Sequence, residues 1–503
     1  MRAAHLVPAG VVVLVLGGIF GAAQLAGPAP AGAGLPAMPP QHVTVTSAAR
    51  ACPPVQGGGS GQVAFIAGPS ASAASGPAGQ AALTPVPLAG ALLRPVSPIS
   101  PADPGALWLL NIPAPQNVSK KAATPAVQGW SVTASGTMAQ AMEAEVASSS
   151  GLASIRCGEP GSDLWFTGPG PQNGVGQIQL DLMNVDSLAA SVDVSIITDA
   201  GQAQAGNDTG ITVPPHQTVT ESLSSAAAGS SVVALEVHTT IGRVAANVSE
   251  TSSHGGSVSW LQSSAPPSTQ LVIPGIPPSS SAASLYVVIP GNANARINVV
   301  AVTQQGLYHP FGTQTVDLPG DSASYVALTP LGGTSASLEL TANVPVTAAV
   351  LVPGSGLGVF TSATAPISEQ AVIAGNTTGS GLGATVVLTA PAGAARIRVT
   401  EISTTAAGRT GSGSAAQPPL TATQVVSVQA RHTLTVQASP PKGAKGGTPF
   451  ALVITPLAGS GPVYAARVET QGQNTAVSII PAVSALTTIT LSPVRDSYNA
   501  ISP

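Results

Sequence analysis

The sequence predicts an all-β protein made of tandem antiparallel β-sandwich domains of the immunoglobulin-like kind, and three observations support this fold class. The sequence ARINV at 295–299 returns as ARIRV at 395–399. Short segments such as VDVSI at 192–196 alternate apolar and polar residues, as a strand with one buried face must. Gly, Pro, Asn and Ser fill the gaps between these segments, where they favour turns.

The flanks of the repeated segment are repeated as well. A Gly-terminated opening occurs as FTG at 166–168, IPG at 273–275 and IAG at 373–375. A closing motif occurs as VAANV at 244–248, VTAAV at 346–350 and VYAARV at 463–468. The spacing predicts three repeats of about 100 residues each, the usual size of one sandwich domain.

These repeats predict a domain organisation for the whole chain. An N-terminal transmembrane or signal helix comes first, and the three sandwich domains follow a linker. The expected segments are a signal anchor or signal peptide at 1–25, a Pro/Ala-rich linker at 26–50, an enlarged first domain at 45–265, a second domain at 266–368 and a third domain at 369–495.

The N-terminal segment is apolar from Leu6 to Ala23, and Arg2 is the only charged residue before it. Its length is at the lower bound for a helix that crosses a membrane, and it also suits the apolar part of a secretory signal. Small residues at 31–33 offer a cleavage site. Both interpretations export the chain, because positively charged flanks stay inside. We therefore expect an extracytoplasmic protein that one N-terminal helix attaches to the membrane, or a secreted protein if the helix is cleaved.

Composition agrees with export and argues against several partners. Lys and Arg number 16 against 20 Asp and Glu, and the net charge of −4 gives no basic surface for nucleic acid. The chain has no Gly-rich phosphate loop with a following Lys, so we expect no nucleotide. The two cysteines, Cys52 and Cys157, most simply form one disulfide in an exported chain, the alternative being two unpaired thiols.

A resemblance to a known family is carried by the stretch CGEPGSDLWFTG at 157–168, together with the sequence around Cys52, Trp130 and the closing motifs. Here the chain resembles an actinobacterial family of exported or membrane-anchored proteins, domain of unknown function 5719. The resemblance implies a single N-terminal apolar segment, a cell-envelope location and β-rich tandem domains. It implies no reaction, so no functional residue is carried over.

Residues for catalysis are not grouped in any recognisable pattern. The sequence contains no Gly-x-Ser-x-Gly elbow and no His pair at metal-ligand spacing, so we expect no catalytic residue, metal or cofactor. The acids Glu143, Glu145, Asp163 and Asp181 are the candidates for a glycosidase pair, but nothing in their spacing distinguishes them from solvated or turn-capping acids, which is the interpretation we prefer.

Two further groups of side chains have ordinary structural interpretations. Trp165 and Phe166 are expected to plug a core rather than to form a sugar platform. Arg296 and Arg396 are expected to face outward on equivalent strands, where they discourage edge pairing.

We expect a non-enzymatic cell-envelope protein that binds, or structurally supports, envelope proteins or cell-wall glycans. The alternative is an accessory hydrolase or transferase that acts on envelope polysaccharide. A third interpretation is a spacer that holds another module away from the membrane.

Overall fold

The computed structural model describes residues 41–55, 60–68, 79–90, 104–112, 127–148, 154–203, 209–255, 257–278, 283–310, 312–329, 331, 333–354, 356–379, 381–404, 419–444, 447–472 and 475–491. The described residues are all-β, with two short 3-10 turns, η3 (Gly136–Ala139) and η4 (Pro171–Asn173). No helix among them is long and apolar enough to cross a membrane. The predicted helix from Leu6 to Ala23 lies outside the described residues.

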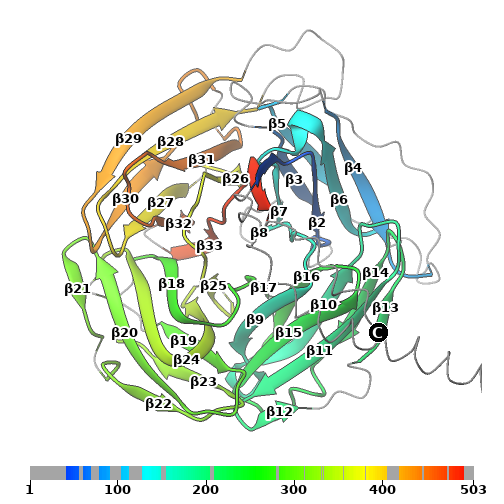
Figure 1. Cartoon of the computed structure of the whole chain (residues 1–503), viewed down its shortest axis with the longest axis vertical. Helices are drawn as coiled ribbons and strands as arrows, with labels where there is room; N and C mark the ends of the chain where they lie inside the picture. The colour runs from blue at the N-terminus through cyan, green and yellow to red at the C-terminus, as the bar shows by residue number, and fades with distance from the viewer. Residues whose placement is uncertain are drawn as a thin grey trace, which may run out of the picture. The chain divides into compact units, whose positions relative to one another are not determined.

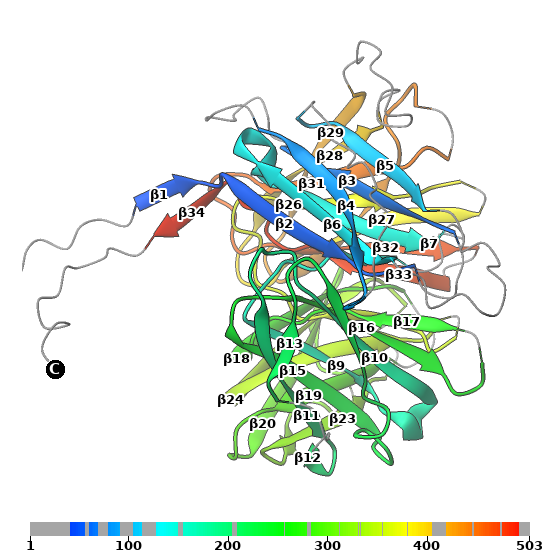
Figure 2. The ribbon, with the colours of Figure 1, turned by 90° about the vertical axis from the view of Figure 1, so that its right-hand side faces the viewer.

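The chain divides into two compact units. The first combines Met1–Val43 with Thr488–Pro503, and the second is Thr44–Thr487. In the first unit, strands β1 (Gln41–Thr44) and β34 (Thr488–Leu491) pair into a two-stranded sheet, and Figure 2 shows them side by side. The side chains of His42 and Thr490 meet across this pair, with Nδ1 and Oγ1 3.2 Å apart.

The described part of the second unit forms four pairs of antiparallel sheets, and each pair encloses a buried apolar cluster. We number these pairs sandwich 1 to sandwich 4. Sandwich 1 has one sheet of β2 (Ser47–Cys52), β6 (Val127–Ser135) and β4 (Ala81–Pro87), and another of β5 (Leu107–Ile112), β3 (Gly61–Ile66), β7 (Glu143–Ser148) and β8 (Ser154–Arg156).

Sandwich 2 begins at the stretch that carries the family resemblance. Its first sheet contains β12 (Gly201–Ala203), β13 (Ile211–Val213), β11 (Ala190–Thr198), β15 (Val232–Ile241) and β9 (Asp163–Pro169). Its second sheet contains β14 (Thr218–Ser222), β10 (Val175–Met183), β16 (Ala245–Ser252) and β17 (Val258–Leu261).

Sandwich 3 differs in that one long strand serves both sheets. The first half of β24 (Ala336–Val352) pairs with β18 (Ser268–Ile276) and β20 (Ala295–Thr303), and β20 also pairs with β21 (Gly306–Tyr308) and β22 (Val316–Leu318). The second half of β24 pairs with β19 (Ser284–Ile289) and β25 (Val359–Ser362), and β19 pairs with β23 (Ser322–Ala327).

Sandwich 4 completes the series with two four-stranded sheets. The first is ordered β26 (Ala371–Asn376), β31 (Phe450–Pro456), β28 (Ala395–Ser403) and β29 (Thr421–Val428). The second is ordered β30 (His432–Ala438), β27 (Leu382–Ala390), β32 (Tyr464–Gln471) and β33 (Thr475–Pro481).

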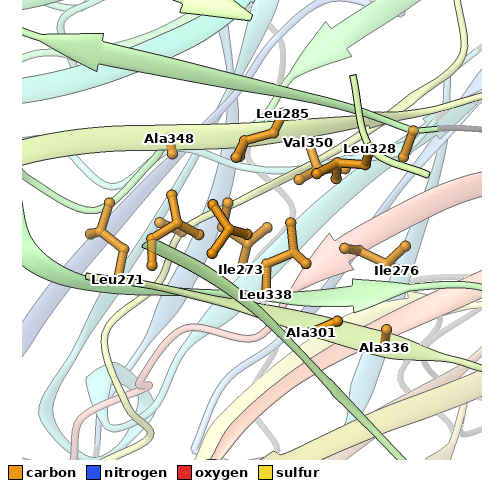
Figure 3. Close-up of a cluster of buried hydrophobic side chains, with 14 of the residues drawn as sticks. Leu271, Ile273, Ile276, Leu285, Ala301, Leu328, Ala336, Leu338, Ala348 and Val350 are labelled. Atoms are coloured by element: carbon orange, nitrogen blue, oxygen red, sulfur yellow. The ribbon is translucent and has the colours of Figure 1, made fainter. Parts of the chain in front are cut away.

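The alternating residues of the repeated segments occupy matching places in sandwiches 3 and 4. Ile297 on β20 pairs with β24, and Ile397 on β28 pairs with β31. Their exposed fractions are 1% and 0%. Figure 3 shows the interior of sandwich 3, where Leu271, Ile273 and Leu338 lie opposite Leu285 and Val350. Burial of these aliphatic side chains is the main force that holds the two sheets together.

Neighbouring sandwiches also share buried apolar clusters. Sandwich 1 meets sandwich 2 at Val86 and Met183, and sandwich 2 meets sandwich 3 at Trp165 and Tyr286. The cluster of sandwich 3 extends to Ala466 of sandwich 4. Sandwich 4 in turn packs against sandwich 1. Their shared cluster contains Val372, Ala374 and Val453 of sandwich 4 and Ala64, Ile66 and Leu107 of sandwich 1. The four sandwiches of this unit therefore follow one another around a ring (Figure 1).

Two expected segments differ from what is found. Residues 41–50 of the expected linker form β1 and the start of β2. Their alternation (HVTVT) is typical of a strand, but the Pro/Ala-rich residues before them favoured a linker. The expected enlarged domain at 45–265 holds two sheet pairs with separate buried clusters, sandwich 1 and sandwich 2. The long Gly/Ala/Ser-rich stretches of sandwich 1 carry few apolar residues, so its strands gave a weak signal.

The predicted disulfide between Cys52 and Cys157 is confirmed. Both cysteines are fully buried, with Cα atoms 4.3 Å apart, and they are 105 positions apart in the sequence. We expect the C52A/C157A double variant to lower the free energy of unfolding by about 2–4 kcal/mol, because a cross-link over a long loop restricts the unfolded chain. Urea unfolding of both proteins measures the difference. Equal midpoints would show that the bond is dispensable for stability.

The opening glycine of sandwich 3 is held against sandwich 4. Gly275 has φ +85°, and a Cβ placed there would lie 2.3 Å from the Cβ of Ala466. We expect G275A to lower stability by about 1–3 kcal/mol through overpacking. The control is G210A, since Gly210 also has a positive φ of +68° but open space around it. A melting temperature for G275A equal to that of G210A would contradict the close packing of sandwiches 3 and 4.

Candidate functional site

Sandwiches 1 and 4 meet at a buried ion network centred on Arg467. The Nη2 atom of Arg467 lies 3.0 Å from Glu145 Oε1, and Nη1 lies 2.9 Å from Glu469 Oε1. The guanidinium also donates to the Gly375 carbonyl and to the hydroxyls of Ser154 and Ser478. All three charged side chains are at least 96% buried. Burial alone would lower the pKa of Arg467, but Glu145 and Glu469 outweigh it and raise that pKa.

The carboxylates of this network have further donors. The backbone N–H of Gly375 donates to Glu145 Oε2 at 3.0 Å, and the N–H of Thr377 donates to Glu469 Oε1 at 2.9 Å. Burial nevertheless raises the pKa of Glu469 above its ordinary value. Glu145 and Ser154 come from β7 and β8 of sandwich 1, while Arg467, Glu469 and Ser478 come from β32 and β33 of sandwich 4. The network therefore joins elements from the two ends of the ring.

A second ion cluster lies on the same strand of sandwich 1. Glu143, 1% exposed, accepts from Arg50 Nη2 at 2.8 Å and from Arg156 Nε at 2.8 Å. Burial alone would raise the pKa of Glu143, but Arg156 and Arg50 hold it below its ordinary value. Arg50 also approaches the exposed Glu159, with Nη2 3.5 Å from Oε2. The charges of this cluster compensate one another: two guanidinium groups face two carboxylates.

Strand register explains how an arginine came to be buried. Arg467 pairs with Val386 and Ile480 in the same way that Val248 of sandwich 2 pairs with Leu180 and Leu261. The core position is therefore valine in sandwich 2 and arginine in sandwich 4. The side chain of Arg467 reaches past its own sandwich to sandwich 1, where Glu145 neutralises it.

The same comparison identifies an unpaired acid in sandwich 2. Glu250 pairs with Ile178 and Ser259, as Glu469 pairs with Ala384 and Ser478. Glu250 is 0% exposed, and within the described residues neither carboxyl oxygen has a hydrogen-bond partner. Because Val248 stands where sandwich 4 has Arg467, no guanidinium reaches this carboxyl from that position. Burial raises the pKa of Glu250 well above its ordinary value.

A cavity of about 120 Å³ lies where sandwiches 1, 2 and 4 converge. Its polar wall includes Arg156, Asn247 and Gln262, of which Asn247 is 1% exposed and Gln262 8% exposed. Its apolar wall includes Leu164 of sandwich 2 and Pro481 of sandwich 4. Glu159 also lines the cavity, and its 62% exposed side chain marks the side that faces solvent. This cavity is the candidate functional site, since buried amides and an arginine converge on it.

The stretch that carries the family resemblance forms one wall of this cavity. Cys157, Gly158, Glu159, Leu164 and Phe166 all line it. Phe166 and Trp165 are buried, at 1% and 3% exposure, so their predicted role as core residues is confirmed. Arg296 and Arg396 face outward as predicted, and Arg296 pairs with Asp317 on the surface. Their predicted role against edge pairing is wrong, because β20 and β28 have a neighbouring strand on each side.

The four candidate acids are not solvated or turn-capping as a group, and here the sequence prediction was wrong. Glu143, Glu145 and Asp181 are buried within strands, and only Asp163 is exposed. Asp181 accepts from Thr220 Oγ1 at 2.7 Å, and burial raises its pKa. The structure brings Glu143 and Glu145 to adjacent ion clusters and leaves Asp163 and Asp181 in sandwich 2. Arg467, Asn247 and Gln262 were not singled out from the sequence as site residues. For Arg467, its place in the third closing motif was a usable signal.

Metal ligation finds no support in the part of the chain that the structure describes, where no group of three His, Cys, Asp or Glu side chains could hold an ion.

No curated protein matches the chain, and no solved structure matches it. The profile of a family of unknown function, DUF5719, matches residues 116–440, which is more than half of the chain. The match includes the 157–168 stretch, Asn247 and Gln262. The chain therefore belongs to the DUF5719 family.

Proposed function

We propose that the chain is a non-enzymatic cell-envelope protein, membrane-anchored or secreted, that acts as a binding or structural module for envelope proteins or glycans. The observation that carries this proposal is the Arg467 network. It uses Glu145 and Glu469, two closely placed buried acids, as structural partners of one guanidinium, and it ties sandwich 1 to sandwich 4. Together with the disulfide, it suits a rigid scaffold that presents a preformed surface.

The finer architecture belongs to the same proposal. We propose that sandwiches 3 and 4, within 266–368 and 369–495, are tandem immunoglobulin-like repeats, and that sandwich 2 is the third repeat, which sandwich 1 precedes within 45–265. The matching pairings of Ile297 and Ile397 support repetition. The apolar segment from Leu6 to Ala23 would be the anchor or signal that places the scaffold outside the cytoplasmic membrane.

Two experiments test this proposal on the full-length chain. Cell fractionation with external protease should find the sandwiches outside the membrane, and mass measurement of the N-terminus should distinguish an anchor from a cleaved signal. The purified chain, kept in a detergent without a sugar headgroup, should retain envelope proteins or cell-wall glycan. A chain that stays in the cytoplasm, or that retains neither partner, would refute the proposal. Release of new reducing ends from envelope polysaccharide would instead favour the accessory hydrolase.

A further inference from the structure

We propose that the cavity between sandwiches 1, 2 and 4 binds one neutral hydroxylated sugar unit, either free or at the end of a glycan. This inference rests on the proposed binding role and deepens it by naming a site and a ligand class. The first argument is the composition of the wall. Side-chain amides such as those of Asn247 and Gln262 can both donate and accept hydrogen bonds, which is what a hydroxyl group needs from its partner.

The burial of these amides indicates a preformed binding site. Asn247 lies on β16 with 1% of its surface exposed, and its Nδ2 donates over a long 3.9 Å to Met183 Sδ, a weak acceptor. A buried amide that is poorly paired is costly, and a ligand that supplies hydrogen bonds relieves that cost. The apolar wall of Leu164, Pro481 and Val483 faces these amides across the same cavity and suits the C–H face of a sugar ring.

Charge and size narrow the ligand class. Arg156 is already held by Glu143 through Nε and Nη2, and Arg50 lies between Glu143 and Glu159, so the charges around the cavity compensate one another. A neutral ligand therefore fits better than an anion. The volume of about 120 Å³ corresponds to roughly four waters at about 30 Å³ each, so the cavity takes one face of a sugar ring with its hydroxyls, and the rest of the ring extends through the open side at Glu159.

The test is saturation-transfer NMR on the full-length chain in a detergent without a sugar headgroup. Neutral monosaccharides and short oligosaccharides are added in separate arms. Inorganic phosphate is the anionic arm, and its binding is followed by the broadening of its phosphorus resonance because it has no C–H protons. We expect sugar signals and no phosphate binding. Binding of monosaccharides identifies a free sugar as a sufficient ligand, whereas binding of oligosaccharides alone identifies a glycan end.

Three variants assign the signal to the cavity. N247A and Q262A remove the amides, and V483F fills the space from the apolar side; each should weaken binding at least about tenfold. N298A is the matched control, because Asn298 lines a separate open pocket on sandwich 3 with Arg296 and Gln314. If N247A does not fold, Q262A and V483F still test the site, provided that their melting temperatures equal that of the wild type. No sugar binding, equal binding in all variants, or binding of phosphate alone overturns the inference. Retention of envelope proteins by V483F would leave the broader proposed function standing.

Discussion

Replacing Arg467 with methionine is expected to lower the free energy of unfolding by about 3–5 kcal/mol, because it leaves two acids buried without their cation. Among the described residues, Glu145 and Glu469 would keep the N–H donors of Gly375 and Thr377. The loss should be smaller at pH 5 than at pH 8, since burial raises the pKa of Glu469 and this carboxyl, without Arg467, can take up a proton as the pH falls. Urea unfolding at the two pH values measures both effects.

Two other variants separate this explanation from a general loss of packing. R296M removes a cation from the exposed pair with Asp317, whose side chains are 70% and 66% exposed, and should leave the unfolding midpoint unchanged. The triple variant E145L/R467M/E469L replaces the whole charged group by apolar side chains and should recover most of the loss. If R467M unfolds at the wild-type midpoint at pH 8, the network does not stabilise the contact between sandwiches 1 and 4.

The strand content was predictable because alternation is a local property of the sequence. Ile297 and Ile397 fall on buried faces as the pattern predicts, and the apolar residues Trp165 and Phe166 are in clusters. The disulfide was predictable because the chain has two cysteines and is expected to be exported, without any knowledge of geometry.

The ion clusters were not predictable in this way because they depend on which sandwich covers which face. On β7, Ala144 and Val146 face the core of sandwich 1, so alternation sends Glu143 and Glu145 to the opposite face. A single sandwich would expose that face to water, but sandwich 4 covers it. Likewise, Arg467 interrupts the apolar side of its strand pattern, and the sequence does not show that Glu145 of sandwich 1 lies beside it to compensate its charge.

Replacing Glu250 with methionine is expected to raise the free energy of unfolding by roughly 3 kcal/mol or more at neutral pH, because it removes a buried carboxyl that has no hydrogen-bond partner among the described residues. Methionine has nearly the same length and is apolar, so it fills the same space beside Gly168 and Leu261. The position tolerates an apolar residue by analogy, since Val352 occupies the corresponding end of β24 in sandwich 3.

The pH dependence of this gain follows from the direction of the pKa shift. The folded state holds the Glu250 proton to a higher pH than the unfolded state, whose pKa is near the ordinary value of 4.5. Below that value both states are protonated and titration contributes nothing to their difference. As the pH rises above it, the unfolded state releases the proton first, so the wild-type protein loses up to about 1.4 kcal/mol per pH unit until the folded-state pKa is reached. The advantage of E250M over the wild type should therefore grow with pH. E250Q cannot ionise either, so its stability relative to the wild type should grow with pH in the same way. The gap between E250M and E250Q should stay constant with pH, because it reflects only the cost of burying a polar amide. A constant difference between E250M and the wild type from pH 4 to pH 8, measured by urea unfolding, would mean that Glu250 is already ionised in the folded protein and has a partner there.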